Sequence, residues 1–148
     1  MVQTIASILN EKGDAVWSVT PESTVYEAIA VMADKSIGAV LVVRGEELVG
    51  ILSERDYARK VILQGKSSKR TRVAEIMTTS LITVPPEATV DGCMRMMTHH
   101  RVRHLPVVDG RRGVVGVLSI GDLVKAVIAD QAETIEQLNS YIGSRYPA

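Results

Sequence analysis

The stretch Gly50-Ile51-Leu52-Ser53-Glu54-Arg55-Asp56 returns later in the chain as Gly116-Val117-Leu118-Ser119-Ile120-Gly121-Asp122. The likeness continues upstream, where five residues are matched 65 positions later: Val19, Pro21, Glu22, Thr24 and Val25 by Val84, Pro86, Glu87, Thr89 and Val90. A repeat of this length indicates that each copy forms one supersecondary unit. Because a solenoid needs about three repeats to bury a continuous core, two copies predict a closed pair.

The composition is typical of a globular protein. The chain has 148 residues, no formal net charge and 46% hydrophobic residues, which suffices for a buried core. The absence of a sustained basic patch argues against nucleic acid as a partner. The longest apolar run, residues 37–43, is too short to span a bilayer, so we expect no membrane segment. With Cys93 as the single cysteine and no visible secretory signal, we predict a cytoplasmic protein.

Apolar spacing predicts an α/β (α+β) fold in which each copy has the order β-α-β-β-α. In the first copy the expected elements are a strand at 16–19, a helix at Thr24–Lys35, strands at Ala39–Val43 and Leu48–Leu52, and a helix at Ser53–Leu63. In the second they are a strand at Leu81–Val84, a helix at Thr89–His100, strands at Leu105–Val108 and Val114–Leu118, and a helix from Ile120 toward Tyr141.

The domain organisation follows from the repeat. We predict repeat 1 at residues 1–65, a polar linker at 66–72 and repeat 2 at 73–148 with an extended final helix. Short helical leads, at Ile5–Leu9 and Val73–Met77, precede the two copies. Six strand residues are predicted to be buried: Val42, Val43, Leu52, Val107, Val108 and Leu118.

The chain resembles the CBS domain family, which is named after cystathionine β-synthase. The resemblance rests on four segments in order: Val73–Thr78, Thr83–Val90, Arg101–Val108 and the two Gly-x-x-Ser-x-x-Asp endings. More narrowly, the chain is similar to small stand-alone bacterial CBS-pair proteins. The resemblance implies two repeats around a pseudo-twofold axis, homodimers, and adenine nucleotides bound in the clefts between repeats as a metabolic signal.

The Ser-x-x-Asp motif has two physical interpretations, and the residues alone leave both open. Ser53 and Asp56, like Ser119 and Asp122, stand where a strand passes into a helix, the arrangement of a capping box. The same geometry suits a nucleotide, because a carboxylate accepts ribose hydroxyls and a helix N-terminus attracts phosphate. Gly121 favours binding, since glycine in a first helical turn weakens the helix and leaves its backbone open.

The resemblance distributes the site residues over two clefts. The first is expected to use Ser119, Gly121 and Asp122 for the ribose, Ile37, Gly38 and Ala39 for the base, Trp17 and Lys12 nearby, and Arg103 and His104 for phosphate. The second is expected to use Ser53 and Asp56 for the ribose, and Ile82 and Val102–His104 near the base. Arg55 is expected to supply the positive charge there. Lys125 either contributes to binding or forms an ion pair with Asp122. Arg103 and His104 are expected beside the phosphate in the Asp122 cleft, whereas Gly38 and Ala39 occupy the matching positions in the Asp56 cleft. We therefore predict that the Asp122 cleft binds the nucleotide more tightly.

Catalytic and metal sites are not indicated. The sequence lacks a nucleophile elbow, a P-loop and a Cys-x-x-Cys motif, so we predict no enzymatic activity and no catalytic cofactor. His99, His100 and His104 are not expected to share a helix face, so we predict no metal site. The leading hypothesis is a regulatory module that binds AMP, ADP, ATP or NAD and signals to an unidentified partner protein. The alternative is a structural or assembly protein whose motifs only cap helices.

Overall fold

A computed structural model of the chain describes residues 3–13 and 15–145, with side chains to residue 142. It has mixed helices and strands that form two compact units. Unit 1 joins the N-terminal segment before Ala15 to the part of the chain from Val84 onward, and unit 2 is Ala15–Thr83. Among the described residues, no helix combines the length and apolarity that crossing a bilayer requires.

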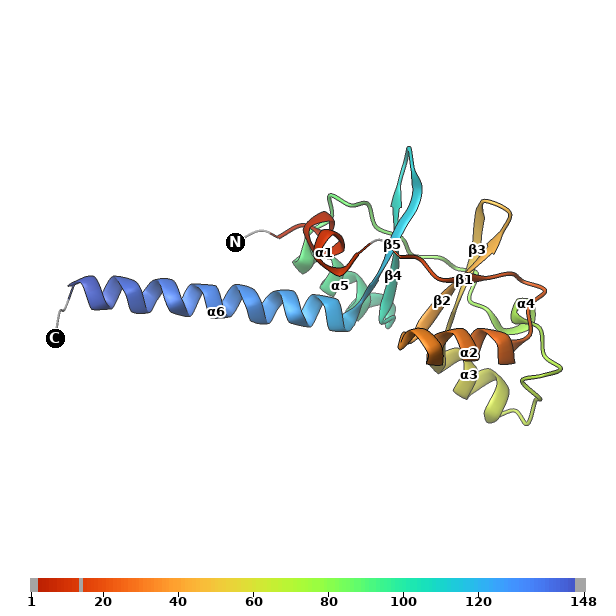
Figure 1. The fold of residues 1–148 in the computed structure, drawn as a ribbon. Coiled ribbons are helices and arrows are strands. Elements are labelled where there is room, and N and C mark those ends of the chain that lie inside the picture. Colours follow the sequence, from red (N-terminus) through yellow and green to blue (C-terminus); the bar gives the residue numbers. More distant parts are fainter. Residues whose placement is uncertain (1–2, 14, 146–148) are drawn as a thin grey trace. The chain divides into compact units, whose positions relative to one another are not determined.

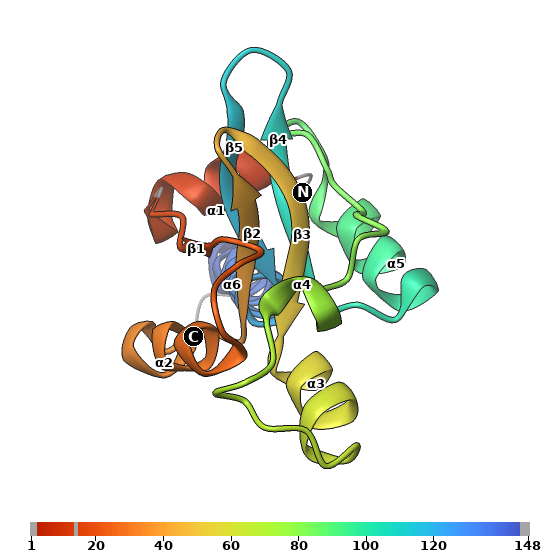
Figure 2. The same ribbon diagram turned by 90° about the vertical axis from the view of Figure 1, so that its right-hand side faces the viewer.

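Unit 2 contains the first copy of the repeat. Its elements are β1 (Ser18–Val19), α2 (Val25–Lys35), β2 (Ala39–Arg44), β3 (Glu47–Ser53), α3 (Glu54–Tyr57), the π-helix η1 (Ala58–Ile62) and α4 (Val73–Ile76). The strands form one sheet in the order β1-β2-β3, in which β1 and β2 are parallel and β2 and β3 antiparallel. Figure 2 shows α2 and α3 at the same end of the β2–β3 hairpin.

Unit 1 contains the second copy. Its elements are α1 (Ile5–Lys12), α5 (Val90–His100), β4 (His104–Asp109), β5 (Gly113–Ser119) and α6 (Ile120–Arg145). The strands β4 and β5 form an antiparallel hairpin, and α5 packs against the start of α6 (Figure 1). The final helix runs through Tyr141 as predicted, so it extends well beyond its counterpart in the first copy.

The central helices of the two copies confirm the predicted repeat. Thr24 caps α2 by accepting from the backbone N–H of Glu27, and Thr89 caps α5 by accepting from that of Gly92. Both helices end at a left-handed residue, Ser36 or Arg101. Their buried faces also correspond: Val25, Ala28 and Met32 in α2, and Val90, Cys93 and Met97 in α5. Cys93 therefore occupies the predicted inward position.

The predicted strand Leu81–Val84 is wrong. Only a single parallel bridge forms there, between Val84 and Val107. The cause lies in β4. In the first copy the backbone N–H of Leu41 donates to the carbonyl of Trp17 at 3.2 Å. The residue equivalent to Leu41 is Pro106, which has no N–H to donate, so a matching bond to Ile82 is impossible.

Burial in the hairpins differs from prediction at two positions. Val42, Leu52, Val107 and Leu118 are fully buried as predicted, and the residues of β2 before Val42, from Ala39 to Leu41, are buried as well. Val43 and Val108, however, are only half-buried. The strand register shifts between Val42 and Val43, and again between Val107 and Val108. Such an irregularity bends the strand and redirects the residue that follows it.

The first copy also differs at its last helix. The predicted single helix Ser53–Leu63 consists of α3 followed by the π-helix η1, in which the N–H of Leu63 donates to the carbonyl of Ala58. Nothing in the local sequence accounts for this widening. The linker, by contrast, is tied to α2: Val25 donates to the carbonyl of Thr71 and Tyr26 to that of Ser68.

Each helical lead packs in the unit that holds the other copy. The lead α4 precedes the second copy but lies in unit 2, where Val73 and Ala74 donate to the carbonyls of Ser23 and Pro21. The lead α1 lies in unit 1 and bonds in the same way, with Ile5 donating to Ala88 and Ala6 to Pro86. The division at 1–65, 66–72 and 73–148 stays a prediction about repeats, because the compact units group the leads differently.

Two strand glycines allow these leads to approach closely. A Cβ atom on Gly116 would lie 2.7 Å from Cδ2 of Leu9 in α1. A Cβ atom on Gly50 would lie 2.8 Å from Sδ of Met77 and 3.1 Å from the backbone oxygen of Thr78. All three distances are shorter than ordinary van der Waals contacts of a carbon atom. Both repeat copies therefore use a glycine to seat the lead against the second hairpin strand.

We expect Gly50→Ala to lower the free energy of unfolding by about 1–3 kcal/mol, because the added methyl group overpacks the contact with Thr78. The measurement is urea denaturation. Gly110→Ala is the matched control, since a Cβ atom there meets nothing within 4 Å. It should change the free energy by less than about 0.5 kcal/mol. Equal stability of the two variants would contradict this account of the close approach.

Candidate ligand-binding site

The first Ser-x-x-Asp motif forms a complete capping box where β3 passes into α3. The backbone N–H of Asp56 donates to Oγ of Ser53 at 3.1 Å, and the backbone N–H of Ser53 donates to Oδ2 of Asp56 at 3.0 Å. The two bonds satisfy donors that a helix start leaves unpaired. The Asp56 side chain is 14% exposed, so its carboxylate lies near the surface but is mostly covered.

The second motif forms the same box where β5 passes into α6. The backbone N–H of Asp122 donates to Oγ of Ser119 at 3.2 Å, and the backbone N–H of Ser119 donates to Oδ2 of Asp122 at 2.8 Å. The Asp122 side chain is 15% exposed. The capping that the sequence predicts is therefore present in both copies. The capping boxes are compatible with both interpretations, because a carboxylate that caps a helix N-terminus and stays partly exposed can also accept a ligand.

The leads give the two carboxylates different partners. In unit 2, Thr78 is held on β3 by backbone bonds to Ile51, and its hydroxyl lies 3.3 Å from Oδ1 of Asp56. Lys60, on the next turn, adds an ion pair of 3.2 Å to the same oxygen. Both oxygens of Asp56 are thus engaged within the described part of the chain.

In unit 1 the partner is Lys12, at the end of α1. Its Nζ atom donates to Oδ2 of Asp122 and to the carbonyl oxygen of Val117, each at 2.8 Å. Val117 is the repeat equivalent of Ile51, so both leads bond at the same point of the second strand. The hydrogen bonds described for Asp122 all reach Oδ2. Within the described residues, Oδ1 is therefore the oxygen left to accept from a ligand.

These contacts keep Asp122 ionised. Burial alone would raise the pKa of its carboxyl group, but the hydrogen bonds from Lys12 and Ser119 outweigh burial and hold the pKa below the ordinary value of 3.8. Asp122 is thus a carboxylate at neutral pH, and a carboxylate accepts hydroxyl donors more strongly than a neutral group does.

His104 is the first residue of β4 and lies next to the motif of Ser119 and Asp122. It is paired across the hairpin with Ser119, and the backbone carbonyl of its neighbour Arg103 accepts from Ile120 at the start of α6. Burial lowers the pKa of His104 from 6.5, and the nearby charges of Lys12 and Arg103 lower it further, against an opposing effect of Asp122. The structure thus gathers Lys12, Arg103 and His104 around the motif of Ser119 and Asp122.

The remaining candidate residues are placed as follows. Trp17, Ile37, Gly38, Ala39 and Ile82 belong to unit 2, and Val102, Gly121 and Lys125 to unit 1. Gly38 and Ala39 adjoin the first motif, because Ala39 pairs with Ser53 and the carbonyl of Gly38 accepts from Glu54. Trp17 is 39% exposed, and Nζ of Lys35 lies 4.3 Å from its ring centroid. Arg55 lies in α3.

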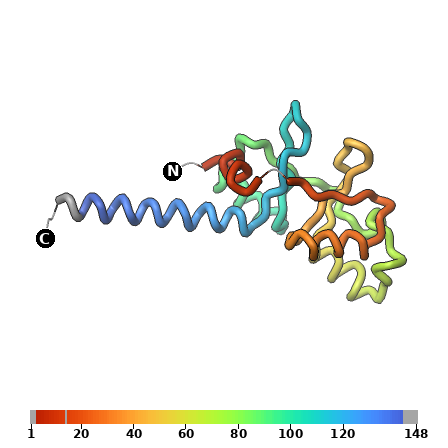
Figure 3. Tube along the Cα trace, viewed as in Figure 1, coloured from red at the N-terminus to blue at the C-terminus, as the bar shows by residue number. Residues whose placement is uncertain are grey.

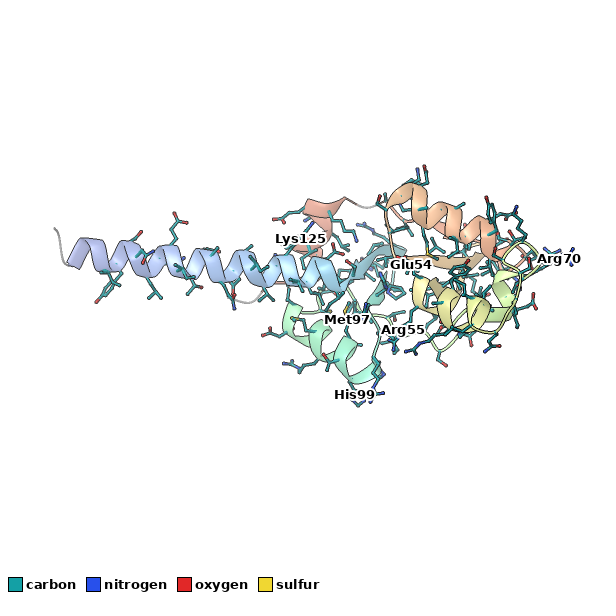
Figure 4. The ribbon with its side chains drawn as sticks, turned by 90° about the horizontal axis from the view of Figure 1, so that it is seen from below. Glu54, Arg55, Arg70, Met97, His99 and Lys125 are labelled. Carbon is teal, nitrogen blue, oxygen red and sulfur yellow. The ribbon has the colours of Figure 1, made fainter. Side chains whose placement is uncertain are left out.

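Two partners of Asp56, Lys60 and Thr78, were not predicted from the sequence, which also left the role of Lys125 open. Lys125 lies on the exposed side of α6 (Figure 4), and the ion pair described for Asp122 is made by Lys12 instead. Lys60 was detectable, because it stands four residues after Asp56, the spacing of a helical ion pair. Thr78 gave no local signal, since it reaches Asp56 only through the packing of α4.

Comparison with known proteins identifies the family. The CBS domain family matches residues 8–62 and 73–129, which together make up most of the chain. The chain belongs to the CBS domain family. It is 45% identical over 152 residues to the mitochondrial CBS domain-containing protein CBSX3 of Arabidopsis thaliana, covering 97% of this chain and 73% of that protein.

Solved structures show the same fold. A protein with CBS domains from Burkholderia ambifaria MC40-6 is 55% identical, with a TM-score of 0.83 over 87% of this chain and 96% of that one. The CBS domain pair of protein MJ0100, solved with 5′-methylthioadenosine and S-adenosyl-L-methionine, is 25% identical, with a TM-score of 0.78 over 88% and 99% of the two chains. A CBS pair of this fold thus accepts ligands that contain adenosine.

The described residues contain no group of three or more His, Cys, Asp or Glu side chains arranged to hold a metal ion. His99 and His100 contact each other edge to face at the end of α5, with ring centroids 4.8 Å apart. They lie at the exposed end of that helix, whereas His104 is half-buried in β4. The three histidines of this CBS protein are therefore divided between two elements.

The depressed pKa of His104 predicts a loss of stability in mild acid. The folded state favours the neutral imidazole, so the stabilisation is fully present above pH 6.5 and is lost as the pH falls below it. We expect the unchanged chain to lose more free energy of unfolding between pH 7 and pH 5 than His104→Gln does. Urea denaturation at the two pH values measures the difference.

The control for this experiment is His99→Gln, which alters an exposed histidine in α5 and should keep the pH dependence of the unchanged chain. Asp122 does not confuse the comparison. Its pKa is also depressed, but the stability it contributes is lost only as the pH falls below 3.8. If His104→Gln and the unchanged chain lost the same stability between pH 7 and pH 5, the assignment of His104 would be wrong.

Proposed function

We propose that this protein is a regulatory module that binds an adenine nucleotide. The observation that carries the proposal is the ionised Asp122 at the start of α6, with Lys12 bonded to it at 2.8 Å and His104 beside it. The adenosine ligands of the MJ0100 pair support the ligand class. AMP, ADP, ATP and NAD all carry a ribose, whose hydroxyls a carboxylate accepts, and phosphate, which a lysine attracts.

The ribose is proposed to bind at the carboxylate. Its two hydroxyl groups would donate to Asp122, which accepts from the backbone of Ser119 and from Lys12 through Oδ2. Phosphate would be attracted by Lys12 and Arg103, and by the backbone N–H groups at the start of α6. Trp17, Ile37, Gly38, Ala39 and Lys125 stay predictions as further contacts of this ligand.

The motif of Ser53 and Asp56 is proposed to bind more weakly. Both oxygens of Asp56 already accept from neighbours, Oδ1 from Lys60 and Thr78 and Oδ2 from Ser53. A ribose would have to displace some of them. The positions equivalent to Arg103 and His104 are Gly38 and Ala39, which carry no charge. Arg55, Ile82 and Val102 remain predicted contacts of this second ligand.

The alternative is that both motifs only cap helices, in a structural or assembly protein without a ligand. The complete capping boxes favour it, since they give each Ser and Asp a role without any nucleotide. Thermal melting with millimolar AMP, ATP and NAD separates the two functions. A nucleotide at a hundred times its dissociation constant adds about 2.7 kcal/mol to the free energy of unfolding. An unchanged melting temperature with every adenine nucleotide would favour the alternative.

Three further features belong to the proposal. We predict a homodimer formed through the repeat helices, because Tyr26 in α2 and Ile62 and Leu63 at the end of η1 are exposed apolar side chains. A monomeric mass by light scattering at micromolar concentration would contradict it. We also predict that the protein has no catalytic activity and is cytoplasmic. Nucleotide turnover that depends on Asp56 or Asp122 would overturn the first of these.

A further inference from the structure

The C-terminal half of α6 is a helix whose apolar side chains are exposed. Every residue from 131 to 142 is exposed within the described structure. Figures 1 and 3 show this part of α6 continuing past the other elements of unit 1. Helices in proteins gain most of their stability from packing an apolar face, and an isolated helix shorter than about 12–15 residues is marginal in water. A partner for this face is therefore expected.

The exposed apolar residues follow a heptad. Starting at Val124, the spacing alternates between four and three residues, as in a coiled coil. We call this set the α6 seam: Val124, Ile128, Gln131, Ile135, Leu138 and Ile142. Its five apolar members are between 43% and 60% exposed. The sequence period thus places these exposed apolar side chains on one face of the helix.

The types of residue on the seam fit a second copy of the same helix. Isoleucine fills every a position, at 128, 135 and 142, and Leu138 fills a d position. Isoleucine at a with leucine at d favours parallel two-stranded coiled coils. The seam is therefore complementary to itself.

The charges on α6 favour the same partner. From 127 to 142 the positions that line or flank the seam carry no charged residue. The acidic residues of this segment, Asp130, Glu133 and Glu136, all fall on the outer face of the heptad. A charged peptide would therefore find no complementary charge at the seam, whereas an identical uncharged seam leaves no charge unpaired.

Gln131 determines the orientation. In a parallel pair in register, each d residue faces its own counterpart, so the two Gln131 amides can hydrogen-bond to each other. In an antiparallel pair, d residues face a residues, and every a residue here is isoleucine. That arrangement would leave a buried amide without a partner, which is costly. A single polar residue in a coiled-coil core is known to specify register in this way.

We propose that two copies of this chain associate through α6 as a parallel, in-register coiled coil along the α6 seam. This contact lies beyond the repeated part of the chain, because the first copy ends its helix at Ile62. It does not depend on nucleotide binding. It is also separate from the proposed contact through Tyr26, Ile62 and Leu63.

The first test is sedimentation of the full chain across a dilution series. We expect the double variant Ile135→Glu with Leu138→Glu to raise the dissociation constant of self-association by about 100-fold or more, because it places charges in the core of the seam. The matched control is Ala129→Glu with Ser140→Glu, which adds the same charge to the outer face. It should change the constant by less than about threefold. Circular dichroism confirms that both variants fold.

The second test reads the orientation directly. The variant Gln131→Cys should form a covalent dimer on mild oxidation, because the two sulfur atoms face each other in a parallel pair. The variant Ser140→Cys should not, since residue 140 is on the outer face. Cys93 does not interfere, because it is buried. An unchanged dissociation constant in the seam variant would overturn the proposal, as would a monomeric unchanged chain. Failure of Gln131→Cys to cross-link more than Ser140→Cys would overturn the parallel arrangement.

Discussion

Replacing Asp122 by alanine is expected to weaken the tighter binding of AMP or ATP by about 100-fold or more. The substitution removes the acceptor of two hydrogen bonds from the ribose, and each hydrogen bond to a charged group contributes about 1.5–3 kcal/mol. The substitution also removes the 2.8 Å ion pair between Lys12 and Asp122, so that Nζ of Lys12 keeps only its bond to the carbonyl oxygen of Val117. Calorimetric titration of the variant and the unchanged chain measures the ratio.

The matched control is Asp56→Ala, which removes the same capping box from the other copy. Loss of a cap lowers the free energy of unfolding by about 0.5–2 kcal/mol in either variant, so stability alone does not separate them. We expect Asp56→Ala to leave the tighter binding event intact. If it abolished that event while Asp122→Ala did not, the two sites would be assigned the wrong way round. If neither substitution changed binding, the motifs would be caps only.

Leu118→Ala is expected to lower the free energy of unfolding by about 2–5 kcal/mol. Leu118 lies on β5, where it pairs with Leu105 of β4, and it is fully buried, so its truncation leaves a cavity in the core. Since a domain is stable by only about 5–15 kcal/mol, this change removes a large part of the total. Urea denaturation measures it.

The control for the core is Leu63→Ala. Leu63 is 78% exposed in the single chain, so at dilutions where the chain is monomeric its truncation should cost less than about 0.5 kcal/mol. It removes the same atoms as Leu118→Ala, and the contrast isolates burial from residue type. A loss of less than 1 kcal/mol for Leu118→Ala would show that unit 1 is not packed around this residue as described.

Much of this architecture can be predicted from the sequence, because it depends on helix capping and apolar spacing between residues close in the chain. Thr24 and Thr89 cap helices where their spacing predicts, Cys93 lies inward at the position of Ala28, and α6 continues through Tyr141. The Ser-x-x-Asp motifs form the capping boxes that their spacing predicts. The repeat supports the assignment of each element, since the helix and the first hairpin strand recur 65 residues later and the second hairpin strand 66 residues later.

What the sequence did not reveal depends on contacts between distant segments. That α1 packs beside β5 rather than beside the first copy follows from Leu9 meeting Gly116, a contact that no local pattern announces. The corresponding packing of α4 in unit 2 brings Thr78 to Asp56. The missing strand at 81–84 was in principle detectable, since Pro106 lacks the N–H that the pairing requires. The half-burial of Val43 and Val108 reflects register shifts that alternation alone does not predict.

Calorimetric titration of the unchanged chain with AMP and ATP, with GMP as the reference, tests most directly whether this CBS protein binds an adenine nucleotide. We predict a saturable heat of binding for an adenine nucleotide and weaker or no binding of GMP. The adenosine ligands of the MJ0100 pair are consistent with that preference. An absence of saturable heat with both adenine nucleotides, at millimolar concentration, would contradict the account.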